Sequence, residues 1–176
     1  MQPRTCEIAG GEARTTRVLI RLNDSRISTG PNFDLVADVD LTKEDEQLSF
    51  WKYRRRKKPK VCVMAHMCRL FGGLSRLNKV LNHNTWHQNY DTIDKPLARF
   101  AGQVAVEQLM DGLDFVNEQP VGSSLYKEKT WPTVLKHPRV SSVNFDQCQL
   151  GQKNSNGISV KKPTQLVHSD ENLVYY

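Results

Sequence analysis

Apolar residues recur at helical spacing in two segments of the chain. Residues 95–112 place apolar side chains on one face, with Pro96 near the start and Gly112 at the end, as in an amphipathic helix. Residues 43–57 show a weaker helical pattern that ends in a basic run, and Thr42 precedes them as a candidate N-cap. The pattern therefore predicts one helix in each segment.

Short apolar runs bounded by turn residues lie around these helices. Residues 60–65 are almost continuously apolar, which is typical of a parallel strand buried on both faces. Comparable runs predict further strands at residues 18–22, 33–37, 113–117, 140–145 and around 160–168, a helix at 124–136 that is broken near Pro132, and a loop with a helical portion at 78–92.

The alternation of strands and helices favours an α/β fold with right-handed crossovers. A helix as long as 95–112 joins parallel neighbours, so strands 60–65 and 113–117 are expected to be adjacent and parallel. We expect a partial Rossmann-type sheet with helices on both faces. In this scheme the domain spans residues 33–169, after a loose N-terminal segment at 1–32 and before a tail at 170–176.

Composition places the chain among globular proteins, with 38% hydrophobic and 25% charged residues. No apolar run approaches the roughly 18 residues of a membrane span, so an intracellular location, nuclear or cytoplasmic, is expected. Four widely spaced cysteines do not suggest a disulfide scaffold. No second ligand pair with zinc spacing accompanies Cys62, His66 and Cys68, so no metal is expected.

The formal charge of +6 is unevenly distributed, since residues 1–88 carry +7 and residues 89–176 carry −1. Much of the excess is one basic run, Arg54, Arg55, Arg56, Lys57 and Lys58. Such a run favours a polyanionic partner. The alternative is a solvated helix end, where cations suit the helix dipole.

Candidate chemistry follows the predicted strands. In open α/β sheets, functional groups gather beyond the C-terminal ends of the strands. Cys68 follows strand 60–65, Glu118 follows strand 113–117, and Lys161 and Lys162 lie on the last strand. Each of these residues also has a purely structural interpretation. Cys68 would be a packed thiol, and Glu118 would cap a helix that starts near Ser123 or Ser124. The two lysines would be surface charges that protect an edge strand.

Three segments carry a family resemblance: KPKVCVMAHMCRLFGGLSRLN, DFVNEQPVGSSLY and VKKPTQLV. They resemble, in order, the strand before the Pro-Cys motif, the Glu-Asn-Val motif and the basic strand of DNA cytosine-5 methyltransferases. The chain is most similar to a divergent branch found in phages and retroelements, whose strands run into Pro-Pro-Cys, Glu-His-Pro or Glu-Asn-Pro, and Lys-Pro-Thr. The match covers residues 33–169.

The resemblance implies S-adenosylmethionine as cofactor and DNA, or else RNA, as partner. Cys68 would add to carbon 6 of cytosine, and Glu118 would hydrogen-bond ring nitrogen 3. The base must leave the duplex to reach them, so cations that hold phosphates are expected. The candidates are Arg54, Arg55, Arg56, Lys57, Lys58, Arg69, Arg76, Lys161 and Lys162.

The chain also departs from the family pattern. His66 and Met67 replace the two prolines, and Gln119 replaces the asparagine. No glycine turn after a strand is recognisable before residue 33, because Gly10-Gly11 follows no evident strand. We therefore expect a truncated or degenerate methyltransferase-like domain that neither binds the cofactor nor methylates DNA.

Two alternatives remain open at this point. The first alternative is a catalytically inactive nucleic-acid-binding domain of a mobile-element protein. The second is a cysteine-dependent enzyme, a hydrolase or a transferase. The second alternative would pair Cys68 with His66, His83 or His87 as base.

Overall fold

A six-stranded mixed sheet organises the protein, whose computed structural model describes residues 5–11, 14–22, 28–73 and 75–174. The strand order is β2-β1-β3-β4-β6-β5; the first four are parallel, and β6 is antiparallel to both β4 and β5. The strands are β1 (Thr5–Ile8), β2 (Thr29–Phe33), β3 (Val61–Met64), β4 (Asp114–Pro120), β5 (Ser141–Asp146) and β6 (Pro163–His168).

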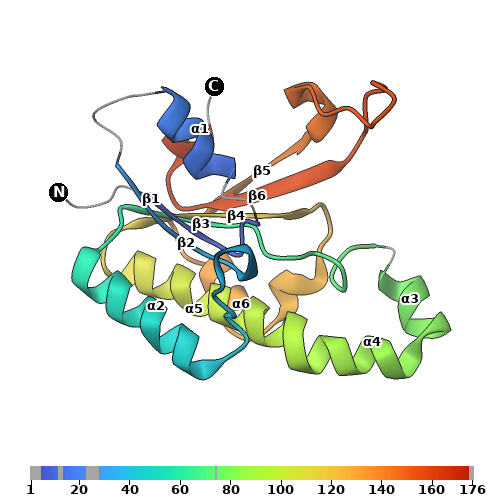
Figure 1. Cartoon of the computed structure of the whole chain (residues 1–176), viewed down its shortest axis with the longest axis horizontal. Coiled ribbons are helices and arrows are strands. Elements are labelled where there is room, and N and C mark those ends of the chain that lie inside the picture. The colour runs from blue at the N-terminus through green and yellow to red at the C-terminus, as the bar shows by residue number, and fades with distance from the viewer. Residues whose placement is uncertain (1–4, 12–13, 23–27, 74, 175–176) are drawn as a thin grey trace.

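Helices cover both faces of this sheet, with α1 on one face and α2, α5 and α6 on the other (Figure 1). The α-helices are α1 (Arg14–Leu22), α2 (Glu44–Lys57), α3 (Ser75–Leu81), α4 (His83–Asn89), α5 (Lys95–Met110) and α6 (Trp131–Leu135). A π-helical turn, Tyr90–Asp94, joins α4 to α5, and 3-10 turns lie at Leu35–Ala37, Ser124–Lys127, Gln147–Leu150 and Glu171–Leu173.

The core lies between the sheet and the three helices α2, α5 and α6 that cover one of its faces. Cys6, Cys62 and Phe115 form one row across β1, β3 and β4, and all three are fully buried. From the helices, Phe50 and Phe100 pack edge to face with their ring centroids 5.2 Å apart. This packing fixes the two long helices against the central strands.

The central α/β unit confirms the main sequence prediction. The strands β3 and β4 are parallel neighbours, with Cys62 opposite Phe115, and α5 packs against both. The helices predicted at 43–57 and 95–112 correspond to α2 and α5.

The N-terminal prediction is wrong for the described residues. Instead of a loose segment, Thr5–Ile8 forms a strand between β2 and β3, and Arg14–Leu22 is a helix where a strand at 18–22 was expected. The strand expected at 33–37 ends at Phe33, since Asp34 begins a 3-10 turn. A four-residue strand buried on a sheet shows too little alternation to be recognised locally.

Smaller differences concern helix ends. Thr42 does not cap α2, because its hydroxyl donates to Asp40 at 2.6 Å and Lys43 takes the N-cap position. The helix predicted at 124–136 is a 3-10 turn followed by α6, where Pro132 lies in the first turn. The last strand begins at residue 163 rather than near 160.

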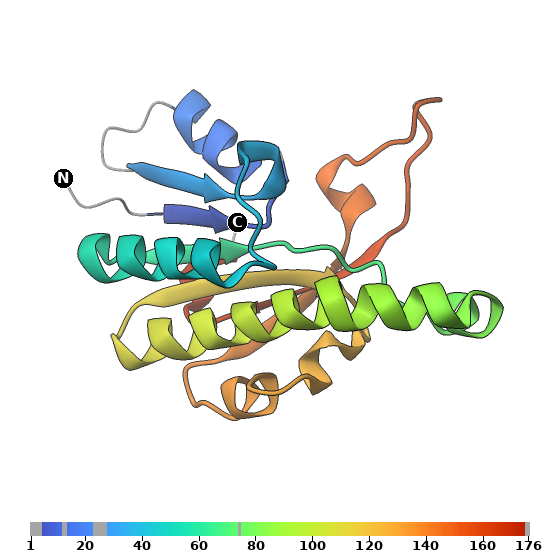
Figure 2. The same ribbon diagram turned by 60° about the horizontal axis from the view of Figure 1, so that its bottom comes forward.

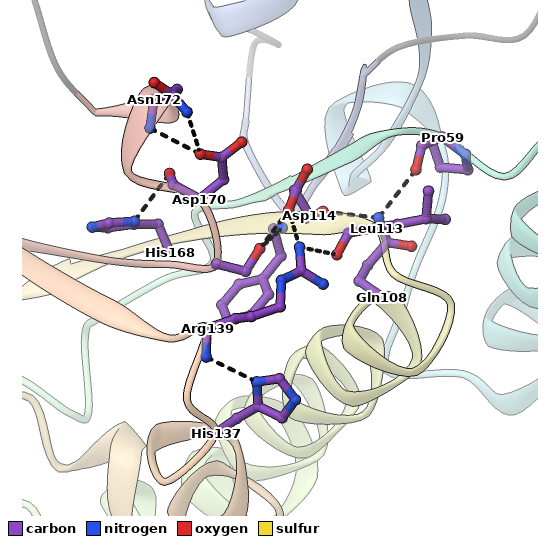
Figure 3. A network of polar contacts seen from close by, with 11 residues as sticks. Pro59, Gln108, Leu113, Asp114, His137, Arg139, His168, Asp170 and Asn172 are labelled. Carbon is purple, nitrogen blue, oxygen red and sulfur yellow. Dashed lines mark hydrogen bonds and ion pairs between the residues drawn. The ribbon is translucent and has the colours of Figure 1, made fainter.

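A buried polar network joins helices and strands at the N-terminal edge of the sheet (Figure 3). Gln108 Nε2 donates to the carbonyl oxygens of Pro59 and Asp114 at 3.1 and 2.8 Å. The Asp114 carboxylate accepts from Arg139 at 2.5 Å and from Ser169 Oγ at 3.1 Å. These bonds satisfy polar groups that would otherwise be buried without partners.

The opposite, C-terminal edge of the parallel strands carries two extensions. The helical arm formed by α3 and α4 and the segment between β5 and β6 both extend from this side of the molecule (Figure 2). Among the described residues, none of the helices combines the length and the apolar composition needed to cross a bilayer.

Candidate functional site

A cavity of about 700 Å³ opens at the C-terminal edge of the parallel strands. Its wall is formed by the residues that follow β1, β2 and β3, by Glu118 of β4, and by Gln147, Gln152 and Lys162 from the segment between β5 and β6. The volume lies within the usual range for small-molecule sites.

A glycine turn forms one end of this cavity. Gly10 and Gly11 lie between the C-terminal end of β1 and the start of α1, so the strand–glycine–helix order that seemed absent from the sequence is present. Gly11 has φ +62°, a conformation that favours glycine. Its N–H donates to Asp34 Oδ2 at 2.9 Å, and its carbonyl accepts from Asn32 Nδ2 at 2.8 Å. The turn is thereby fixed to the end of β2.

Glu7 lies beneath the turn and is 2% exposed. Its two carboxylate oxygens accept hydrogen bonds from the backbone N–H groups of Thr15 and Thr16, at 3.1 and 2.9 Å. These amides belong to the first turn of α1, where carboxylates are stabilised by unpaired N–H groups and by the helix dipole. Glu7 therefore fixes the start of α1 to the end of β1.

Acidic and apolar groups follow β2. Asp34 lines the cavity and accepts from Val36 N at 2.9 Å as well as from the glycine turn. Leu35 and Val36 also line the cavity, and both are more than half exposed. Asp40 completes this wall, and the hydrogen bond from the Thr42 hydroxyl lowers its pKa.

Glu118 lies on the opposite side of the cavity, in β4. Its Oε1 accepts from Gln147 Nε2 at 3.3 Å and lies 3.6 Å from Lys162 Nζ. Glu118 does not cap the following turn, because Ser123 Oγ occupies that position by accepting from Leu125 N. The carboxylate is thus available to the cavity.

Cys68 lies in the loop after β3 and is half-buried. Since β3 and β4 are parallel, Cys68 and Glu118 lie toward the same edge of the sheet, as predicted, although Glu118 lies within β4 rather than after it. Their contact with one base stays a prediction. The loop packs on the end of β4: a Cβ atom built on Gly72 would lie 3.5 Å from the Cys68 carbonyl oxygen and 3.9 Å from Pro120 Cγ. Met67, rather than Cys68, contributes to the described cavity wall.

Residues that depart from the family pattern fix this loop. Gln119 is fully buried, and its Nε2 donates to the His66 carbonyl oxygen at 3.1 Å. The His66 ring is also buried, and burial lowers its pKa to about 4. Both of its ring nitrogens lack a hydrogen-bond partner among the described residues. His66 therefore gives no support to a Cys68–histidine pair.

The other two histidines proposed as bases lie on α4. The rings of His83 and His87 contact each other with their centroids 4.3 Å apart. Within the described part of the chain, no hydrogen bond joins Cys68 to a histidine. The geometry thus gives the hydrolase alternative no nucleophile–base pair.

The basic run proves to be heterogeneous. Arg54 is 1% exposed and forms ion pairs with Glu107 at 3.4 Å and Asp111 at 3.1 Å, so its proposed contact with nucleic acid is wrong. The other four cations, Arg55, Arg56, Lys57 and Lys58, lie at the end of α2. That end precedes β3, so the run lies at the edge of the sheet opposite the cavity.

The remaining candidate cations lie on segments at the cavity edge. Arg69 pairs with Asp94 at 3.2 Å, and Lys161 lies 3.8 Å from Asp146 while its side chain remains 75% exposed. Arg76 is part of α3, but its side chain lies outside the described structure.

Sequence reasoning missed Glu7, the glycine turn and Asp34. One signal was available, because Gly10-Gly11 lies between an apolar pair, Ile8-Ala9, and a helical segment. Asp34 then follows 23 residues after Gly11, close to the separation of about 20 residues seen between glycine turn and acidic residue in nucleotide-binding sheets. Comparison with known proteins adds no family assignment, since no family model, curated protein or solved structure matches this chain.

Proposed function

We propose that this chain is a methyltransferase-like domain, related to DNA cytosine-5 methyltransferases, that binds S-adenosylmethionine in the cavity. One observation carries the proposal: a strand–glycine–helix turn and Glu118 line the same cavity, next to the loop that holds Cys68. We further assign the sheet to the Rossmann type, in which ligands bind where the strand order reverses, here between β1 and β3.

The lining residues fit the parts of this cofactor. The backbone of Gly10 and Gly11 permits close approach of its amino-acid portion. Asp34 lies at the end of β2, where a carboxylate binds ribose hydroxyls in related sheets. Leu35 and Val36 offer an apolar wall to the adenine ring. When bound, the cofactor would supply the methyl group.

Cys68 and Glu118 would act on the cytosine. Carbon 5 of cytosine is a weak nucleophile, and addition of the Cys68 thiolate to carbon 6 would raise its electron density. Glu118, in its protonated form, would donate to ring nitrogen 3 and so offset the negative charge that thiolate addition brings onto the ring; Gln147 and Lys162 lie beside its carboxyl group. After methyl transfer, loss of the carbon-5 proton would expel the Cys68 thiolate and restore the ring. The base reaches such a site only after leaving the duplex.

From the sequence alone we expected neither cofactor binding nor methyl transfer, because no glycine turn was recognisable. The glycine turn that lines the cavity supports the opposite expectation. Calorimetric titration should show saturable binding of one S-adenosylmethionine per chain, and labelled cofactor should transfer methyl groups to cytosine in DNA. We expect Cys68→Ser to lower the transfer rate by more than about a thousandfold, because it removes the nucleophile. Cofactor binding should be unchanged in this variant.

Cys148→Ser is the matched control, since Cys148 is also a half-buried free thiol but lies in the 3-10 turn after β5 rather than in the loop after β3. It should retain full transfer activity. Binding of cofactor and DNA without transfer would support the inactive nucleic-acid-binding alternative. Absence of cofactor binding to the folded protein would contradict the proposal as a whole.

A further inference from the structure

We infer that Glu7 makes the cavity selective for a cationic nucleoside and against nucleotides that carry phosphate groups. This inference rests on the proposed function, because it assumes that a nucleoside binds beside the glycine turn. It goes further by assigning a specificity-determining residue and by predicting which adenosine derivatives are excluded.

The start of a helix after a glycine turn is ordinarily a site for phosphate. Unpaired N–H groups and the helix dipole both favour an anion there, and nucleotide-binding sheets place a pyrophosphate at this position. In this protein the N–H groups of Thr15 and Thr16 already donate to the two oxygens of Glu7, at 3.1 and 2.9 Å. The chain's own carboxylate occupies the anion position.

Glu7 is held firmly in this position. It is 2% exposed, it lies in β1 between two parallel neighbours, and both of its carboxylate oxygens accept hydrogen bonds from α1. A phosphate placed against the turn would therefore meet a second anion in a poorly solvated site, where like charges repel strongly.

The rest of the wall has the same sign. The charged residues described along the cavity are the carboxylates of Glu7, Asp34, Asp40 and Glu118 and one ammonium group, that of Lys162. Lys162 is itself paired with Glu118. The cavity is thus acidic, although the chain carries a net charge of +6. S-adenosylmethionine, with a sulfonium and an ammonium group against one carboxylate, suits this wall better than any nucleotide.

An affinity series on the unmodified protein tests the inference directly. Calorimetric titrations with S-adenosylmethionine, adenosine, AMP, ADP and ATP should show weaker binding with each added phosphate. We expect ATP to bind at least about tenfold more weakly than adenosine, a difference of one unit in log Kd. Affinity that rises from adenosine to ATP, as at an ordinary phosphate-binding turn, would overturn the inference.

The Glu7→Gln variant assigns the effect to this side chain. It keeps an oxygen acceptor for one amide and removes the charge, so the gap between adenosine and ATP should narrow by about tenfold. Glu44→Gln is the control, because Glu44 is exposed in the first turn of α2 and lies outside the cavity wall. It should leave the gap unchanged.

The results separate a failure of the proposed function from a failure of the role given to Glu7. If neither S-adenosylmethionine nor adenosine binds, the proposed function fails. If S-adenosylmethionine binds but ATP binds equally well, or if folded Glu7→Gln keeps the full gap, only the inference about Glu7 fails. Thermal unfolding checks that the variant is folded, and if it is not, the series on the unmodified protein decides.

Discussion

Arg54 is a buried cation that joins the two long helices. Its Nε donates to Gln108 Oε1 at 3.1 Å, while its terminal nitrogens pair with Glu107 and Asp111. Gln108 in turn donates to Pro59 and Asp114, so the guanidinium is one end of the polar network at the N-terminal edge. A single side chain of α2 therefore binds three polar residues at the end of α5.

We expect Arg54→Ala to lower the free energy of unfolding by about 2–3 kcal/mol in urea denaturation. Breaking a fully buried ion pair costs about 3–5 kcal/mol, but Glu107 and Asp111 are partly exposed and water will stabilise them after the change. Arg55→Ala, a change at an exposed neighbour, should stay within about 0.5 kcal/mol. Equal effects of the two changes would contradict this role of Arg54.

The sequence pattern assigned Arg54 to nucleic-acid binding for a reason that the structure explains. Within a run of five cations, composition does not distinguish one member from another. Helical spacing does, because Arg54 lies four positions after Phe50, and these two are the fully buried residues of α2. The helical spacing thus indicates that Arg54 is buried, whereas the charge pattern alone does not.

At the scale of elements, β2 depends on one glycine for its contact with β1 and α2. A Cβ atom built on Gly30 would collide with the Tyr53 hydroxyl and would lie 2.7 Å from the Thr5 carbonyl oxygen. The second of these atoms is backbone and cannot rotate away. Gly30 therefore sets how closely β2 approaches its neighbours.

Gly30→Ala should destabilise the protein by about 1–3 kcal/mol, the usual cost of overpacking a close contact. Gly73→Ala is the control, because a Cβ atom there meets nothing within 4 Å. Thermal unfolding of both variants measures the difference. A Gly30→Ala variant as stable as Gly73→Ala would show that β2 can shift outward at no cost.

Elements differ in how well the sequence reveals them. The helix α5 is 16 residues long, and its apolar period is set by its own packing, so it was predicted almost to its ends. The strand β1 has four residues, and its place in the sheet is set by β2 and β3, which lie 24 and 56 residues away in sequence. Because the cavity depends on β1, its glycine turn was missed, whereas Glu118, which lines the cavity, was named from the sequence. The roles given to Glu118 and Cys68 stay predictions.

At the scale of the whole molecule, positive charge lies at both edges of the sheet. Arg55, Arg56 and their neighbours lie at the end of α2, whereas Lys161 and Lys162 lie beside the cavity. A nucleic acid whose base enters the cavity must place its phosphates near the second group. We therefore expect the two groups to contribute unequally to binding.

The Lys161→Ala/Lys162→Ala variant should bind single-stranded DNA more weakly. The slope of its log affinity against log salt should become shallower by about 0.7 for each phosphate that the variant no longer neutralises. The Arg55→Ala/Arg56→Ala variant should change both quantities less. Fluorescence anisotropy at several salt concentrations measures both variants. A larger effect of the second variant would place the DNA at the N-terminal edge instead.

The position of β6 has a consequence for synthesis of the chain. This strand lies between β4 and β5 in space, although it follows both in sequence. A chain synthesised only as far as residue 162 therefore contains five of the six strands, but β5 has no neighbour to pair with and β4 presents an open edge. Because translation adds about 5–20 residues per second, the edge of β4 that faces away from β3 stays unpaired for seconds after β4 is synthesised. Throughout that time the nascent chain exposes a template for pairing with other chains, and emergence of Pro163–His168 closes it.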